Sequence, residues 1–219
     1  MGTLFLIRHG LTPTTGRVLY GRADGISLDD RGRAEAERLA ERFGHVRLTA
    51  IYSSPLQRCV ETVQPLAAAQ RLPIVEREDL IEMDAGTWTG KTLTSLRRRT
   101  AWKDVQVAPS SFRFPGGESF LEAHERVVTE FQGIARRHRR GRVAIATHGD
   151  IVRLLLGHLC GIPMDLFQRL VVETASVSAV QMEGDVPRVM LVNDTGVGLE
   201  RFVPRSVGSR RRTRGNLRG

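Results

Sequence analysis

Two kinds of hydrophobic pattern alternate along this chain. Short, continuous apolar runs have the length of buried strands, and they occupy residues 3–7, 50–52, 72–76 and 142–147. Longer segments repeat apolar residues every three or four positions and predict helices over residues 31–43, from residue 54 onward, from 119 to about 138, and over 149–160. Two final runs, 176–182 and 189–192, predict strands joined in a hairpin around Gly184-Asp185.

This strand–helix alternation predicts the fold class. We expect a single α/β domain of three layers, with a mostly parallel central sheet, an antiparallel edge strand and helices on both faces. The catalytic domain is expected to span residues 1–204, followed by a basic, disordered C-terminal tail at 205–219. The Pro-, Ser- and Gly-rich stretch 108–117 is expected to be a loop, and it could cover the sheet as a lid.

Two helix starts carry a local sequence signal. Ser54 followed by Pro55 and Gln57 predicts an N-cap with a capping box. Ser119 with Glu122 predicts a second capping box, which begins the long helix. The apolar residues expected on one side of helix 31–43 are Ala34, Leu39, Ala40 and Phe43.

Three strands are expected to place side chains that can bind phosphate at one edge of the sheet. In a parallel sheet, ligands bind beyond the carboxyl ends of the strands. Arg8 and His9 end the first strand, Arg58 follows the second, and His148 ends the strand at 142–147. A neutral imidazole can act as a nucleophile, and guanidinium groups hold phosphoryl oxygens in a fork. This arrangement predicts phosphoryl transfer without a metal ion, because arginines supply the positive charge that Mg²⁺ would otherwise supply.

The positive net charge of the chain does not change the predicted function. The net charge is +9, but six arginines of residues 205–219 account for most of it and leave +3 for the rest of the chain. We therefore expect no nucleic-acid partner. No apolar stretch has membrane-spanning length and the N-terminus lacks a signal-peptide pattern, so a cytoplasmic enzyme with no membrane partner is expected. Cys59 and Cys160 are expected to be small buried residues rather than a disulfide or metal ligands.

Several segments together resemble one protein family. Residues 6–10 (LIRHG) resemble the N-terminal signature of the histidine phosphatase superfamily, which includes cofactor-dependent phosphoglycerate mutases and many phosphatases. The similarity continues in order through residues 53–62 (SSPLQRCVET), 80–90 (LIEMDAGTWTG), 115–119 (PGGES) and 146–149 (ATHG), and covers about residues 3–194. Gly32 and Asn193 also fall where the family commonly has them.

The resemblance implies a role for each matching residue. His9 would accept the phosphoryl group, while Arg8, Arg58 and His148 would bind phosphate, with His148 also counted among the catalytic residues. Glu82 would be the general acid and then the base. Spacing alone does not separate Glu82 from Asp84 or Glu78, so only the resemblance selects it. No cofactor and no metal site are expected. The usual glutamates of the family are replaced here by Leu11 and Thr89, which makes substrate transfer by analogy unsafe.

Three functions remain open at this point. A phosphatase would pass the phosphoryl group from His9 to water, and we favour a metal-independent phosphomonoesterase of a small phosphorylated metabolite. A phosphomutase of the phosphoglycerate or sugar-phosphate type would use the same phosphohistidine, and the third alternative is a binding module without activity. The physiological substrate and the oligomeric state, including a homodimer, stay open.

Overall fold

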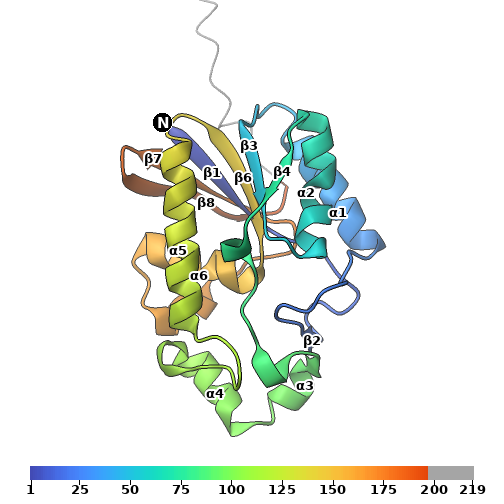
Figure 1. Cartoon of the computed structure of the whole chain (residues 1–219), viewed down its shortest axis with the longest axis vertical. Coiled ribbons are helices and arrows are strands. Elements are labelled where there is room, and N and C mark those ends of the chain that lie inside the picture. The colour runs from blue at the N-terminus through green and yellow to red at the C-terminus, as the bar shows by residue number, and fades with distance from the viewer. Residues whose placement is uncertain (197–219) are drawn as a thin grey trace, which may run out of the picture.

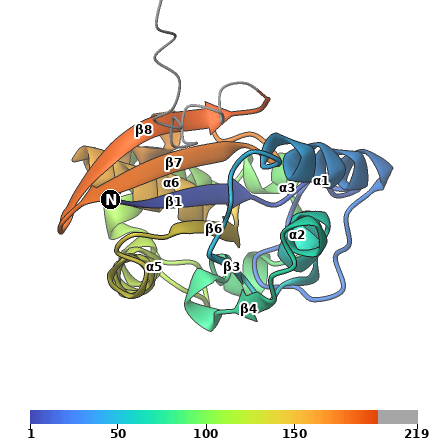
Figure 2. The same ribbon diagram turned by 90° about the horizontal axis from the view of Figure 1, so that it is seen from above.

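The central sheet has six strands, and the strand order places the first strand in its middle. The computed structural model describes residues 1–196, and the order is β4–β3–β6–β1–β7–β8 (Figures 1 and 2). The strands are β1 (Gly2–Arg8), β3 (Ala50–Ser53), β4 (Ile74–Glu76), β6 (Arg142–Thr147), β7 (Val177–Glu183) and β8 (Val186–Asp194). The first four in the sheet are parallel, whereas β7 and β8 run antiparallel as a hairpin at the edge. The predicted fold class is therefore confirmed.

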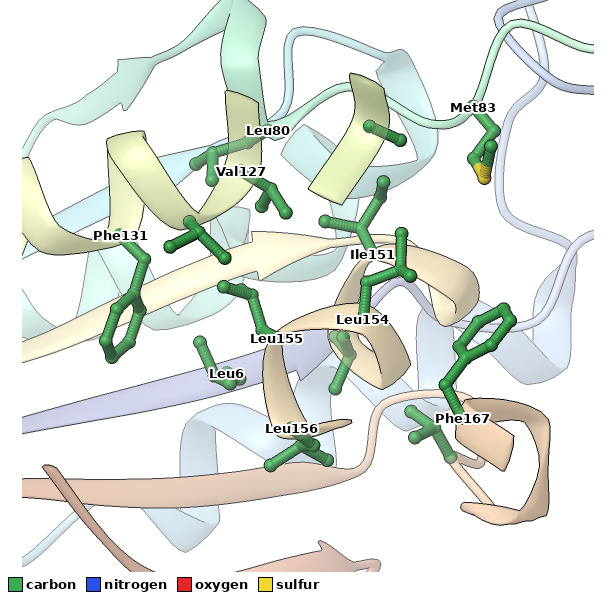
Figure 3. Close-up of a cluster of buried hydrophobic side chains, with 14 of the residues drawn as sticks. Leu6, Leu80, Met83, Val127, Phe131, Ile151, Leu154, Leu155, Leu156 and Phe167 are labelled. Atoms are coloured by element: carbon green, nitrogen blue, oxygen red, sulfur yellow. The ribbon is translucent and has the colours of Figure 1, made fainter. Parts of the chain in front are cut away.

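Helices cover both faces of this sheet (Figure 1). On one side lie α1 (Asp30–Arg42) and α2 (Gln57–Gln70), and on the other lie α5 (Phe120–Arg137) and α6 (Gly149–Cys160). Side chains of β1 alternate between the two cores: Leu4 and Leu6 pack toward α5 and α6, Phe5 and Ile7 toward α1 and α2. Figure 3 shows part of the larger core, which includes Leu6 of β1, Val127 and Phe131 of α5, and Leu155 of α6.

Small elements that the hydrophobic pattern did not predict stand beyond the carboxyl ends of the parallel strands. A two-stranded sheet joins β2 (Val18–Leu19) to β5 (Lys91–Thr92), and two short helices follow, α3 (Leu93–Leu96) and α4 (Thr100–Val107). Short 3₁₀ turns cover Glu78–Leu80, Gly86–Trp88, Pro109–Ser111 and Met164–Arg169. The stretch 108–117 is a loop as expected, and the buried rings of Phe112 and Phe114 anchor it in the larger core.

One predicted helix cap is confirmed and the other is wrong. The Ser119 hydroxyl accepts from the backbone of Glu122, whose carboxylate accepts from the Ser119 backbone, which is a capping box. Helix α2, in contrast, begins at Gln57 with Leu56 as its N-cap and no side-chain cap. The Ser54 hydroxyl is instead used in a contact with His148, so a tertiary partner took the group that the local pattern assigned to the helix.

Two further expectations about burial are wrong. Ala34 is exposed, and Ala36 takes its place beside Leu39 on the buried side of α1. Cys59 is buried as expected, but Cys160 is exposed because it is the last residue of α6. The tail at 205–219 and the end of the predicted domain at 204 lie outside the described residues. No helix in residues 1–196 is both long and apolar enough to span a membrane.

Candidate active site

The strand register brings the three predicted segments to one edge of the sheet. Arg8 pairs with Thr147 across β1 and β6, and Ser53 pairs with Ala146 across β3 and β6. The residues that follow these strand ends, His9 and His148 among them, are therefore neighbours, and their ring centroids lie 5.4 Å apart. This is the arrangement that the parallel sheet predicted.

A cavity of about 530 Å³ opens above this edge. Four of the residues singled out in the sequence line it: Arg8, His9, Arg58 and Glu82. His148 is not part of its wall; the side chain is completely buried, directly behind His9. All five predicted residues thus converge, four on the cavity surface and one beneath it.

Backbone contacts fix the ring of His9. Its Nδ1 lies 2.8 Å from the Gly10 carbonyl oxygen, and a carbonyl oxygen can only accept, so Nδ1 carries the hydrogen. The lone pair of the neutral ring is then on Nε2. The loop is held in turn by Thr62, whose hydroxyl accepts from the Gly10 backbone at 2.8 Å. Gly32 permits this loop to pass, since a Cβ there would lie 2.0 Å from the Leu11 carbonyl oxygen.

The surroundings of His9 keep it neutral. Burial, together with the positive charges of Arg8 and Arg58, lowers the pKa of His9 to about 3. The imidazole is only 8% exposed. At neutral pH it therefore presents an unprotonated nitrogen, which is the form that a nucleophile requires.

The two arginines present donors to the same space. Arg8 donates from Nη1 to the Val172 carbonyl oxygen at 2.6 Å, while its Nε is buried without a hydrogen-bond partner. Arg58 is 3% exposed and donates from Nη2 to the Gly21 carbonyl oxygen at 2.9 Å. A buried N–H that lacks a partner is costly, so the orphaned Nε of Arg8 is suited to an anionic ligand.

Glu82 is an acid that faces the cavity. Its Oε1 accepts from the Met83 backbone at 3.0 Å, and its Oε2 lies 3.9 Å from Nδ1 of His148. Burial, followed by the nearby negative charge of Asp150, raises the pKa of Glu82 to about 7. Such a carboxyl group can both give and take a proton near neutral pH.

The tertiary structure separates Glu82 from the two other acids that sequence spacing left open. Asp84 turns its Oδ1 to the Gly86 backbone at 2.9 Å, and Glu78 is exposed in a 3₁₀ turn. Neither lines the cavity. The backbone of Glu82 is itself clamped, because Arg22 and Arg126 both donate to its carbonyl oxygen, at 3.0 and 3.2 Å.

The sequence reasoning missed two charged residues of the site. Asp150 and Arg153 line the cavity from the first two turns of α6 and form an ion pair of 2.8 Å with each other. Their spacing of three residues, directly after His148, was the available signal. Asp150 matters to the chemistry because its charge contributes to the raised pKa of Glu82.

The upper wall of the cavity is largely apolar, and it too was missed. Most of it comes from the small elements that the sequence pattern did not predict: β2 (Val18, Leu19), α3 (Leu93) and α4 (Trp102, Val105). Phe114, in the loop 108–117, completes it. Trp102 also stacks on the buried Trp88 at 6.1 Å between ring centroids, so it packs and lines the cavity at once. Arg97 stands at the exposed rim of the same wall.

No metal-binding group was found in the part of the chain that the structure describes. Across residues 1–196, no cluster of three or more His, Cys, Asp or Glu side chains is arranged to hold a metal ion. The site as built contains a neutral imidazole, two guanidinium groups and a carboxyl group of raised pKa. These groups can bind an anionic phosphoryl group, attack it and transfer a proton.

Comparisons with known proteins agree with this chemistry. The histidine phosphatase superfamily (branch 1) matches residues 4–195. Phosphoserine phosphatase 1 of Hydrogenobacter thermophilus is 28% identical over 84% of this chain and 88% of its own length. Phosphoglycerate mutase-like protein 4 of Arabidopsis thaliana is 33% identical over 69% of this chain and 68% of its own.

The fold of a solved relative agrees as well. Bacillus stearothermophilus YhfR matches with a TM-score of 0.84 at 31% identity, covering 89% of this chain and 98% of YhfR. The family match, the relatives and the fold all indicate a histidine phosphatase. This chain belongs to the histidine phosphatase superfamily and is an enzyme that acts on phosphate esters.

Proposed function

We propose that this enzyme is a metal-independent phosphomonoesterase that works through phosphorylated His9. The observation that carries the proposal is the hydrogen bond of 2.8 Å between His9 Nδ1 and the Gly10 carbonyl oxygen. It leaves the lone pair on Nε2, in a ring that faces a cavity shared with Arg8, Arg58 and Glu82. A nucleophile, phosphate-binding cations and a proton donor are thus assembled around one space.

In the first step, Nε2 of His9 attacks the phosphorus atom of the ester. The N–P bond forms while the bond from phosphorus to the ester oxygen breaks, and protonated Glu82 gives its proton to the departing alkoxide. The alcohol leaves, and Glu82 is left as a carboxylate. Arg8 and Arg58 hold the phosphoryl oxygens, whose charge they offset in the transition state.

In the second step, water attacks phosphohistidine. The Glu82 carboxylate takes a proton from the water as its oxygen bonds to phosphorus, and the N–P bond breaks. Inorganic phosphate is released, His9 regains its lone pair, and Glu82 is protonated again. The raised pKa of Glu82, about 7, suits both halves of this cycle.

The substrate class is a small phosphorylated metabolite. Relatives bear the names phosphoserine phosphatase and phosphoglycerate mutase-like protein, which supports a small phosphate ester. The cavity volume of about 530 Å³ suits such a ligand, with the phosphate at the polar floor and the leaving group against the apolar wall.

The test is to trap the intermediate and to follow its fate. Enzyme mixed with a radiolabelled phosphomonoester and quenched in alkali should retain an acid-labile, base-stable label, which His9→Ala should abolish together with activity. Release of inorganic phosphate as the main product supports the phosphatase, whereas transfer to a second hydroxyl of the substrate would identify a mutase. Activity should persist in excess EDTA; a loss that a divalent ion restores would refute metal independence.

A further inference from the structure

The two nitrogens of the His148 ring face chemically different neighbours. Nε2 lies 2.8 Å from the Ser54 hydroxyl oxygen and 3.4 Å from Sγ of Cys59. Nδ1 lies 3.9 Å from Oε2 of Glu82 and 3.8 Å from Sγ of Cys59. His148, Ser54 and Cys59 are all fully buried. Water therefore does not mediate these choices, and the side chains themselves decide which nitrogen holds the hydrogen.

His148 has one ring hydrogen to place. Burial, reinforced by the positive charge of Arg58, lowers the pKa of His148 well below its ordinary value. The ring is therefore neutral, with one N–H and one lone pair. A hydrogen on Nδ1 points toward the Glu82 carboxyl group, whose oxygen can accept it, while a hydrogen on Nε2 points toward two groups that carry hydrogens of their own.

The hydrogen bonds around Ser54 indicate which arrangement holds. The Leu56 backbone N–H donates to the Ser54 oxygen at 3.4 Å and uses one of its two lone pairs. The hydroxyl hydrogen itself needs an acceptor, and the His148 Nε2 at 2.8 Å can provide one. The Cys59 thiol has an acceptor of its own in the Thr147 carbonyl oxygen at 3.5 Å, so it does not compete for this role.

We propose that Ser54 is a positioning residue that donates its hydroxyl hydrogen to Nε2 of His148 and thereby keeps the ring hydrogen on Nδ1. The inference rests on the proposed function, because the Nδ1–H is directed toward Glu82, the carboxyl group that transfers a proton in both steps.

If Ser54 keeps the ring hydrogen of His148 on Nδ1, replacing Ser54 should lower kcat. In Ser54→Ala, Nε2 has lost its donor and the ring can place its hydrogen on either nitrogen. A transition state that lacks one of its donors is typically reached ~10²–10³-fold more slowly. Because the variant can still populate the productive tautomer part of the time, we expect a fall in kcat of about 10- to 100-fold, with KM changed less than threefold.

The decisive readout is spectroscopic and needs no activity. In ¹⁵N-histidine-labelled enzyme, long-range ¹H–¹⁵N correlations distinguish Nδ1–H from Nε2–H rings, and His148→Asn assigns the signal. We expect Nδ1–H in the unmodified enzyme and a mixture or the opposite tautomer in Ser54→Ala. Ser53→Ala is the matched control: it removes an equally buried hydroxyl one residue earlier, which donates to the Ser54 carbonyl oxygen and not to His148. It should change neither tautomer nor kcat.

An Nε2–H ring in the unmodified enzyme would overturn the proposal, and so would Ser54→Ala with the tautomer and kcat both unchanged. An equal loss of kcat in Ser53→Ala without a tautomer change would also do so, since it would mark a general packing effect. If Ser54→Ala fails to fold, the spectrum of the unmodified enzyme still decides. Full activity of His9→Ala would instead refute the phosphohistidine mechanism and leave the tautomer measurement standing.

Discussion

The Oε2 atom of Glu82 lies 3.9 Å from Nδ1 of His148, and the acid approaches the site from the side that the phosphate cavity occupies. The carboxyl group therefore shares its space with the groups that would bind the phosphoryl anion. Its raised pKa, which comes first from burial and then from Asp150, follows from this location. Three of the following predictions concern this group.

Replacement of Glu82 should depend on the leaving group of the substrate. General acid catalysis contributes ~10²–10⁴-fold, so Glu82→Gln should lose on that order with an alkyl phosphate. With p-nitrophenyl phosphate the loss should be smaller, because the phenolate leaves without protonation. Steady-state kinetics with both esters measures the difference.

Asp84→Asn is the matched control for this experiment, since Asp84 lies two residues away and outside the cavity. It should show no leaving-group dependence. If Asp84→Asn gave that dependence and Glu82→Gln did not, the acid would be assigned to the wrong residue. A phenolate burst followed by slow turnover in Glu82→Gln would show that hydrolysis of phosphohistidine has become limiting.

The pH dependence should reverse between substrate types. Transfer from an alkyl ester needs protonated Glu82, so kcat should fall as pH rises through about 7. When hydrolysis of the intermediate is limiting, as with a good leaving group, the carboxylate is needed and kcat should fall as pH drops below about 7. Neutral His9, with a pKa of about 3, should add no step above pH 5. Identical profiles for both esters would contradict the two roles of Glu82.

Glu82 should also lower the stability of the folded protein at alkaline pH. Its pKa rises on folding from 4.5 to about 7, so the folded state binds more protons between these values. The free energy of unfolding therefore falls as pH rises through this window, by on the order of 3 kcal/mol. Glu82→Gln carries no charge and escapes the penalty: its Tm should exceed that of the unmodified enzyme at pH 8 and match it near pH 4.5. Equal Tm differences at both pH values would rule this out.

Two glycine substitutions should act in opposite directions. Gly32→Ala places a Cβ 2.0 Å from the Leu11 carbonyl oxygen, so the loop after His9 must move, and both stability and kcat should fall. Gly133→Ala lies in α5, where a Cβ meets only the tip of Arg137 at 3.9 Å, and should stabilise by about 0.5–1 kcal/mol through helix propensity. Thermal unfolding and kinetics of the two variants test this; an active, stable Gly32→Ala would show that the loop tolerates displacement.

Local sequence patterns predict the layers of the fold and the edge of the sheet at which the site lies. Apolar runs and helical periodicity are local, so they predicted the six-stranded sheet and the four long helices before any contact was known. Arg8, His9, Arg58 and His148 follow strand ends, and parallel strands must bring such ends together. The Ser119 capping box is equally local and was confirmed.

The features of the site that depend on residues distant in sequence could not be predicted from local patterns. Spacing could not separate Glu82 from Asp84, because which side chain enters the cavity depends on the clamp of Arg22 and Arg126. Small elements such as β2 and β5 are too short to carry a periodic signal, so the apolar wall was invisible in the sequence. Ser54 carried a local cap signal, but its buried hydroxyl contacts His148, a partner distant in sequence that no local pattern reveals, and the helix begins at Gln57.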